Sequence, residues 1–332
     1  MRNTLPPITE DVRLAQYVMG TVVEVVVSPI AGADHARDAA MAALCEFERI
    51  EGIFSRFDSR SELCRVNRLA AEREVSVSEE FVALLSRGLQ YARHCAAAFS
   101  ICLQPLVDLW EKSSRSGIRP APCELEKAMF LSRPERVMLD ETRRTVRFSN
   151  PGVGLNFDGL AKGYAVDRAR GVLSSYGITR GMINAGSSSI ALLQPPGNSA
   201  CVLGVRHPVN GRACAARFVL KHPAVSTSAT NERGGVIGGR WHSHVIDPAS
   251  GCPIRELVSA TVAGEFAELM EVASKMVLLR GCRQGLETCD RFGWVTDAIV
   301  LREQDRGLLI EHPDSLSVTV DSKHDTHPPC VF

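Results

Sequence analysis

One stretch of the chain, L-N-F-D-G-L-A-K-G, sets an amide, a carboxylate and a lysine beside two glycines in an otherwise apolar frame. Asn156, Asp158 and Gly159 come just before a segment, 160–176, with the apolar spacing of a helix. Lys162 then falls in the first helical turn, where a cation opposes the helix dipole. The free N–H groups of that turn favour an anion. The lysine therefore either points to water or faces an anionic partner such as a phosphate.

Three further stretches carry groups that bind cations, protons or polar ligands. His242 and His244 alternate along a predicted strand and would face one side of it, so they are either a partial metal site or anchored loop residues. The stretch A-G-S-S-S-I-A-L-L at 185–193, a glycine turn with three hydroxyls, fits a hydroxyl-lined ligand wall or a plain polar turn. Glu271 and Lys275 form either an ordinary helical ion pair, worth about 0.2–0.5 kcal/mol, or a site in which the carboxylate binds a hard cation such as Mg²⁺.

The elements that must position these groups indicate an α+β fold. Helical periodicity dominates the first half of the chain, whereas strand-like segments follow one another in the second half without helices between them. Residues 152–159 are expected to form a strand, on which Asn156 and Asp158 share a face. A helix is expected to end at Gly281. This order is typical of mainly antiparallel sheets packed with helices, and no phosphate-binding glycine motif follows a strand.

The overall composition restricts the class of protein. The formal net charge is zero, which makes a nucleic acid a poor candidate as partner. No apolar run is long enough to span a membrane, and the N-terminal segment lacks the apolar core of a signal peptide, so we expect a cytoplasmic protein. The eleven cysteines are scattered without a C-x-x-C pair, which argues against a zinc site. We expect a short arm at 1–14, one domain at 15–314 and a polar tail at 315–332.

A series of short motifs occurs in a fixed order along the chain. They are V-M-G-T at 18–21, S-R-F-D-S-R-S-E-L at 55–63, A-A-F-S at 97–100 with P-L-V-D-L-W at 105–110, the Lys-Gly segment, I-N-A-G-S-S-S at 183–189, S-T-S-A at 226–229, H-V-I-D-P-A-S-G-C-P at 244–253 and E-V-A-S-K-M-V-L-L-R-G at 271–281. This order resembles the ApbE family, the FAD:protein FMN transferases, over about residues 15–300.

The resemblance implies an ApbE-like fold and a defined reaction. Enzymes of this family bind FAD with Mg²⁺, split its pyrophosphate and transfer FMN to a Ser or Thr hydroxyl of an acceptor flavoprotein, and AMP leaves. Two alternatives stay open, namely an FAD pyrophosphatase that yields FMN and AMP, and a non-catalytic FAD-binding protein with a degraded metal site.

The resemblance also implies roles for particular residues. FAD contacts fall on Met19, Phe57, Ala98, Phe99, Ser100, Asn156, Lys162 and Ile246. Metal contacts fall on the carbonyl of Gly159 and on Glu271 and Ser274 in the later helix. Lys162 would add positive charge at the pyrophosphate, and His244 would take the proton of the acceptor hydroxyl.

The chain departs from the family pattern at several of these positions. Asn156 stands where the family usually has Asp, although Asp158 would partly compensate, and Ser100 replaces the Asp of A-F-D. Lys275 replaces a Thr, and a protonated ammonium has no lone pair for a metal. Two interpretations follow. Either Ser274 becomes the hydroxyl ligand and Lys275 turns outward, or the ammonium of Lys275 itself neutralises the pyrophosphate and Mg²⁺ is hardly needed.

Overall fold

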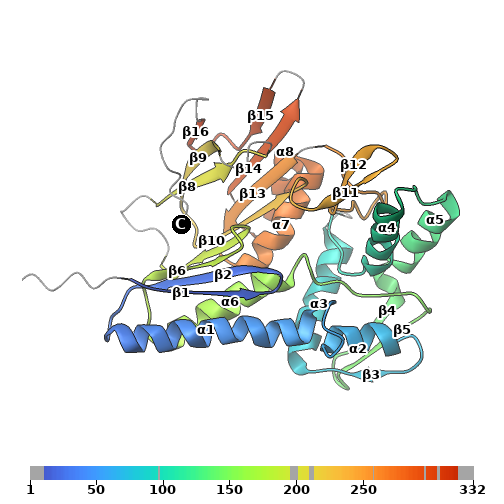
Figure 1. Cartoon of the computed structure of the whole chain (residues 1–332), viewed down its shortest axis with the longest axis horizontal. Coiled ribbons are helices and arrows are strands. Elements are labelled where there is room, and N and C mark those ends of the chain that lie inside the picture. The colour runs from blue at the N-terminus through green and yellow to red at the C-terminus, as the bar shows by residue number, and fades with distance from the viewer. Residues whose placement is uncertain are drawn as a thin grey trace, which may run out of the picture.

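The structure is a computed structural model that describes residues 11–95, 98–194, 201–208, 213–256, 258–294, 297–304 and 307–320. Within these segments the centre of the molecule is an eight-stranded antiparallel sheet with the order β1-β2-β6-β7-β10-β13-β14-β15 (Figure 1). Its strands are β1 (Val12–Val18), β2 (Thr21–Val27), β6 (Gly181–Ala185), β7 (Ser189–Leu192), β10 (Ala224–Ala229), β13 (Val258–Gly264), β14 (Asp297–Gln304) and β15 (Gly307–Glu311). The α+β expectation is confirmed.

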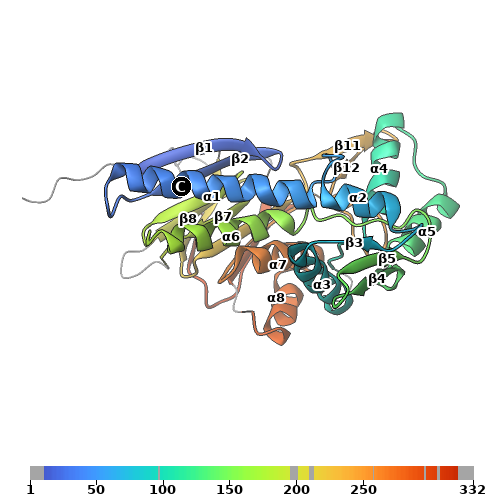
Figure 2. The same cartoon turned by 90° about the horizontal axis from the view of Figure 1, so that it is seen from below.

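Helices cover one face of this sheet. They are α1 (Ala33–Phe54), α6 (Ala161–Ser175), α7 (Ala267–Arg280) and α8 (Cys282–Arg291). Helix α6 lies between α1 and α7, and α7 packs on β10 and β13 (Figure 2). The strands supply alternate residues to this core, for example Val23, Val25 and Val27 from β2. Helix α7 is buried along most of its length and ends at Gly281 as expected, with φ at 80°.

A smaller sheet covers the opposite face. It consists of β8 (Cys201–Arg206), β9 (Cys214–Leu220) and β16 (Val318–Val320), in the order β16-β9-β8. Residues of the central sheet that point away from the helices, such as Val225 and Ile299, pack here against Phe218. Because side chains of a strand alternate between faces, β10 presents Ser226 to α7 and Val225 to this second core.

The remaining elements extend the molecule at one end of the central sheet (Figure 1). They are α2 (Glu62–Leu69), β3 (Val75–Ser76), α3 (Glu79–His94), α4 (Gln104–Ser116), α5 (Pro122–Leu131), the 3₁₀ turn η1 (Pro134–Arg136), β4 (Val137–Asp140), β5 (Thr145–Phe148), β11 (Gly234–Ile237) and β12 (Arg240–Ser243). Helices α4 and α5 enclose a third apolar cluster with the segment after β12, in which Trp110 and Ile246 are buried.

The expected boundaries of the arm and the tail need correction. Residues 1–10 and 321–332 lie outside the described residues, but Val12–Leu14 pair with β2 and therefore belong to the sheet. Val318–Val320 pair with β9, and Leu316 just before them is buried, so the segment after residue 314 joins the second core. Among the described residues, no helix has the length and apolar character needed to cross a membrane.

The segment before α6 is also not the strand that we expected. Residues 153–157 are irregular and end in a turn at 158–160. The Asn67 side chain satisfies this backbone, because its amide oxygen accepts from the N–H of Leu155 and its amide nitrogen donates to the carbonyl of the same residue. A side chain distant in sequence thus forms the hydrogen bonds that a neighbouring strand would otherwise provide.

Candidate functional site

A cavity of about 1200 Å³ opens between the central sheet, the β11–β12 hairpin and α4. Its wall includes the turn between β1 and β2, residues 55–57 after α1, and the irregular segment before α6. Residues of β8, β10 and α7 complete it. Its volume exceeds the roughly 300–1,000 Å³ of pockets that enclose drug-sized ligands, so it has room for a larger ligand.

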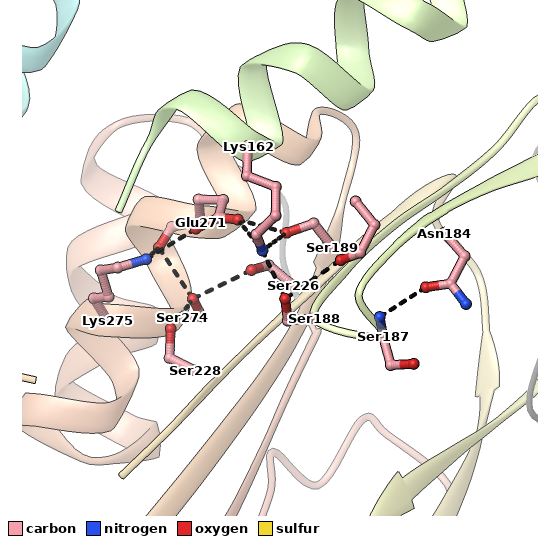
Figure 3. A network of polar contacts seen from close by, with 11 residues as sticks. Lys162, Asn184, Ser187, Ser188, Ser189, Ser226, Ser228, Glu271, Ser274 and Lys275 are labelled. Carbon is pink, nitrogen blue, oxygen red and sulfur yellow. Dashed lines mark hydrogen bonds and ion pairs between the residues drawn. The ribbon is translucent and has the colours of Figure 1, made fainter. Parts of the chain in front are cut away.

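A lysine from α6 forms part of this cavity wall. The Lys162 ammonium donates to the hydroxyls of Ser188 and Ser189 at 2.6 and 2.7 Å and to Oε1 of Glu271 at 2.9 Å (Figure 3). Its side chain is only 20% exposed. The alternative in which this lysine points to water is therefore wrong. The pair with Glu271 offsets the unfavourable position of a cation in the first turn of α6.

A second lysine contacts the same carboxylate. The ammonium of Lys275 lies 3.0 Å from Oε2 of Glu271 and 3.0 Å from its backbone carbonyl oxygen. Burial raises the pKa of the Glu271 carboxyl, but the two lysines and the bond from Ser189 together outweigh burial, so its pKa lies well below the ordinary range. The cluster of Lys162, Glu271 and Lys275, which we call the lysine–glutamate triad, therefore carries two positive charges and one negative charge.

Serines from β10 fill the space beneath the triad. The Ser274 hydroxyl lies 2.7 Å from that of Ser228 and donates to the carbonyl oxygen of Glu271 at 3.0 Å. Ser226 lies 3.5 Å from the same hydroxyl. Ser274 is fully buried. Its hydroxyl is thus engaged with the protein, whereas the ammonium of Lys275 lies at the cavity wall.

The residues that the resemblance assigns to FAD lie around one cavity. Its wall contains Met19, Phe57, Ala98, Phe99, Ser100, Asn156, Lys162 and Ile246. Met19 occupies a hairpin turn with φ at 52°, and its N–H donates to Glu51. A positive φ is uncommon outside glycine, and such strain often marks a functional position. The ring of Phe57 is 73% exposed and lies 4.1 Å below the guanidinium of Arg56.

Asn156 and Asp158 do not share a face. The Asn156 amide donates to Gln104 at 3.0 Å, and its oxygen accepts the N–H of Asp158 at 2.8 Å. The Asp158 carboxylate instead pairs with Arg56 at 2.8 Å. Among the described contacts it does not reach the triad, so the expected compensation by Asp158 is not supported.

The two histidines occupy different environments, although both line the cavity. His242 lies in β12, is 3% exposed and stacks on Trp110. His244 lies one residue beyond the end of β12, which corrects the expectation that both alternate on one strand. Nδ1 of His244 donates to the carbonyl oxygen of Arg233 at 3.0 Å. In a neutral imidazole this donor leaves Nε2 as the acceptor.

The pKa of His244 lies below its ordinary value. The main cause is that the surrounding protein desolvates the ring. The positive charges of Arg233 and Lys275 lower the pKa further. The ring surface is nonetheless open to the cavity. The imidazole is therefore neutral near pH 7, as a general base must be.

A model of the ApbE family matches residues 19–299 of the chain. The chain belongs to the ApbE family. A relative from Klebsiella pneumoniae (strain 342), named FAD:protein FMN transferase, is 30% identical over 240 residues, which cover 71% of this chain and 74% of that protein. A relative of the same name from Rhodobacter capsulatus is 28% identical over 92% of this chain, which spans 57% of that longer protein.

Solved structures of ApbE proteins have the same fold as this ApbE-family chain. The ApbE protein of Thermotoga maritima aligns with a TM-score of 0.80 at 28% identity and covers 92% of this chain and 98% of its own. The flavin transferase ApbE of Vibrio cholerae aligns over the same shares with a TM-score of 0.78 at 21% identity, which shows the fold alone. The ApbE-like fold is thereby confirmed.

Some residues of this ApbE-family site were not assigned from the sequence. Ser188 and Ser189 hold the Lys162 ammonium, and Ser228 holds Ser274. The signal was present in the serine runs, but a run of hydroxyls fits a ligand wall and a polar turn equally well. The role of Arg56, which bridges Asp158 and Glu111, has no local signal in the sequence.

The metal donors expected in this ApbE-family chain are Gly159, Glu271 and Ser274. Both carboxylate oxygens of Glu271 already accept from an ammonium, and Ser274 is bonded within the protein. The described residues contain no group of three or more His, Cys, Asp or Glu side chains arranged for a metal. A cation would meet one carboxylate flanked by two ammonium groups, which does not fit the oxygen-rich surroundings that Mg²⁺ prefers.

Proposed function

We propose that this chain is an FAD:protein FMN transferase, which moves FMN from FAD to a Ser or Thr hydroxyl of an acceptor flavoprotein and releases AMP. The observation that carries the proposal is the lysine–glutamate triad, whose excess positive charge lies on the wall of a cavity large enough for a dinucleotide. A polyanion such as the pyrophosphate of FAD complements this charge. The names of the relatives support the same reaction.

The reaction needs one bond to form and one to break. The acceptor hydroxyl oxygen attacks the phosphorus of the FMN half of FAD, and the bond from this phosphorus to the oxygen that bridges to AMP breaks. AMP leaves with that oxygen and its electron pair. Negative charge on the phosphoryl oxygens is what the protein must stabilise, and the Lys162 ammonium, fixed by two serines and a carboxylate, is positioned for this role.

His244 is our candidate for the base that takes the proton of the acceptor hydroxyl. Its Nδ1 is anchored on Arg233, so Nε2 is the atom that receives the proton. Its lowered pKa keeps it neutral near pH 7. We further propose that Met19, Phe57, Phe99, Asn156 and the other wall residues named above contact FAD.

Dependence on Mg²⁺ was one of two interpretations of the sequence. The contacts of Lys275 with Glu271 favour the other interpretation, in which the ammonium of Lys275 neutralises the pyrophosphate, because this lysine does not turn outward. No step of the proposed reaction therefore passes through a metal. We also propose that the protein acts in the cytoplasm.

The test is incubation of the full chain with FAD and a candidate acceptor, read by mass spectrometry. We expect AMP together with an acceptor heavier by one FMN less water, and no product with the Ser/Thr→Ala acceptor. Lys162→Gln should lower the amount of product by about 100-fold or more, whereas Lys112→Gln, at an exposed lysine, should not. AMP release without an acceptor would instead identify an FAD pyrophosphatase. FAD that stays intact with every acceptor would identify a binding protein.

A further inference from the structure

We infer that the Lys275 ammonium is a built-in cation for the FAD pyrophosphate, so that this chain binds FAD without a divalent metal. The inference rests on the proposed function for the identity of the ligand. Beyond that function, we assign Lys275 as a residue that contacts the substrate. We also predict that one substitution, Lys275→Thr, converts the site into one that binds a metal.

The position of Lys275 is fixed by packing. A Cβ placed on Gly159 would lie 2.7 Å from Cε of Lys275 and 3.5 Å from its Nζ, so the lysine chain occupies the space that the missing side chain leaves. The side chain is 22% exposed. Its ammonium bonds both the side chain and the backbone carbonyl of Glu271, four residues earlier on α7. The charge therefore stays at one point of the cavity wall.

One lysine is enough to balance the charge of Glu271. Its carboxylate is one charge, and Lys162 already balances it through a bond of 2.9 Å, which Ser189 of β7 reinforces by contacting both groups. Lys275 adds a second ammonium to a carboxylate that is only 5% exposed. Two cations on one buried anion leave an unbalanced positive charge, which is costly in a low-dielectric site unless an anion completes it. A pyrophosphate supplies that anion.

The same geometry excludes a divalent cation from the carboxylate. A Mg²⁺ ion bound at about 2.1 Å from either oxygen would lie within about 5 Å of an ammonium nitrogen, since these nitrogens are 2.9 and 3.0 Å from the oxygens. Like charges at this separation repel strongly inside a protein. The ammonium of Lys275 and a metal at Glu271 are thus alternatives.

The first experiment measures metal binding without FAD or turnover. Mn²⁺ is titrated into the full chain and the free ion is followed by electron paramagnetic resonance. We expect no stoichiometric site in the wild type and one site in Lys275→Thr, because this change removes the ammonium from Oε2 of Glu271 and adds a hydroxyl oxygen. The matched control is Lys112→Thr at an exposed lysine, which should behave as wild type. One tight Mn²⁺ site in the wild type would overturn the inference.

The second experiment measures FAD binding by fluorescence in EDTA and in Mg²⁺, with no acceptor present. We expect equal affinity in the two buffers for the wild type. Lys275→Ala should bind FAD about tenfold more weakly or worse in EDTA, since it loses a charged contact. Wild-type binding that appears only with Mg²⁺ would overturn the inference and leave the transferase proposal intact. Equal binding in both buffers, together with FAD that stays intact in the acceptor assay described above, would support the inference and remove the transferase proposal instead.

Discussion

Gly163 on α6 packs directly against the backbone of Ala267 on α7. A Cβ at Gly163 would lie 2.4 Å from the carbonyl oxygen of Ala267 and 2.6 Å from Cγ of Glu271. This close approach of the two helices brings Lys162, the residue before the glycine, onto the carboxylate of Glu271. The glycine is therefore needed for spacing rather than for an unusual backbone angle.

Gly163→Ala should consequently destabilise the protein by about 1–3 kcal/mol, because overpacking forces the two helices apart. Gly171 provides the matched control on the same helix, since a Cβ there meets nothing within 4 Å. Gly171→Ala should stabilise the protein by up to about 1 kcal/mol through helix propensity. Urea unfolding measures both changes. Equal effects of the two substitutions would contradict the packing argument.

Lys162→Gln should separate catalysis from folding. The glutamine amide can still donate to the serines around it, so we expect the variant to fold with a midpoint of thermal unfolding within a few degrees of the wild type. FMN transfer should fall by about 100-fold or more, since a charged donor to the phosphoryl oxygens is lost. Calorimetry without FAD and transfer assays on the same sample provide the comparison. A large drop in stability with little loss of transfer would assign Lys162 to structure alone.

An element of this fold is predictable from the sequence when nearby residues of the chain satisfy its backbone groups. Helix α7 was predictable because its apolar spacing and its terminal glycine are local features of the chain. The segment around Leu155 was not, because the amide of Asn67 satisfies its backbone from 88 residues away. Local propensity carries no information about such a partner.

The candidate site likewise has features that the sequence predicts and features that depend on contacts between distant parts of the chain. The resemblance to the ApbE family placed Lys162, Glu271 and Lys275 in one site, but it left open whether Lys275 turns outward. That question is decided by the space beside Gly159, which depends on how α6 and α7 meet. Likewise, Asp158 was expected near Asn156 on a strand, whereas the turn before α6 directs its carboxylate to Arg56.

The rate of FMN transfer should depend on pH through His244. The pKa of this imidazole lies below its ordinary value of about 6.5, because the protein desolvates it and nearby cations repel its proton. The base is active when neutral, so the rate should be level from pH 8 to about 6.5 and fall only below that range. His244→Asn keeps a donor for Arg233 and should lower the rate by about 10²–10⁴-fold with FAD affinity retained. A rate that already halves above pH 7 would exclude His244 as the base.

His242 should limit stability in acid. Neither ring nitrogen has a hydrogen-bond partner within the described part of the chain, and the ring is buried against Trp110. Burial, with Arg255 and Arg119 nearby, lowers its pKa. The unfolded state therefore binds a proton more readily than the folded state, so the contribution to stability is complete above about pH 6.5 and is lost as the pH falls below it.

His242→Phe should remove this dependence. The phenylalanine ring keeps the stack on Trp110 and needs no polar partner, so we expect the variant to be about 1 kcal/mol more stable at pH 7 and to gain further on the wild type at pH 5. Urea unfolding at the two pH values measures the difference, with His244→Phe as a control at a histidine that has a partner. A loss of FAD affinity in His242→Phe would contradict this account and assign the buried nitrogens to the ligand, since the ring lines the same cavity.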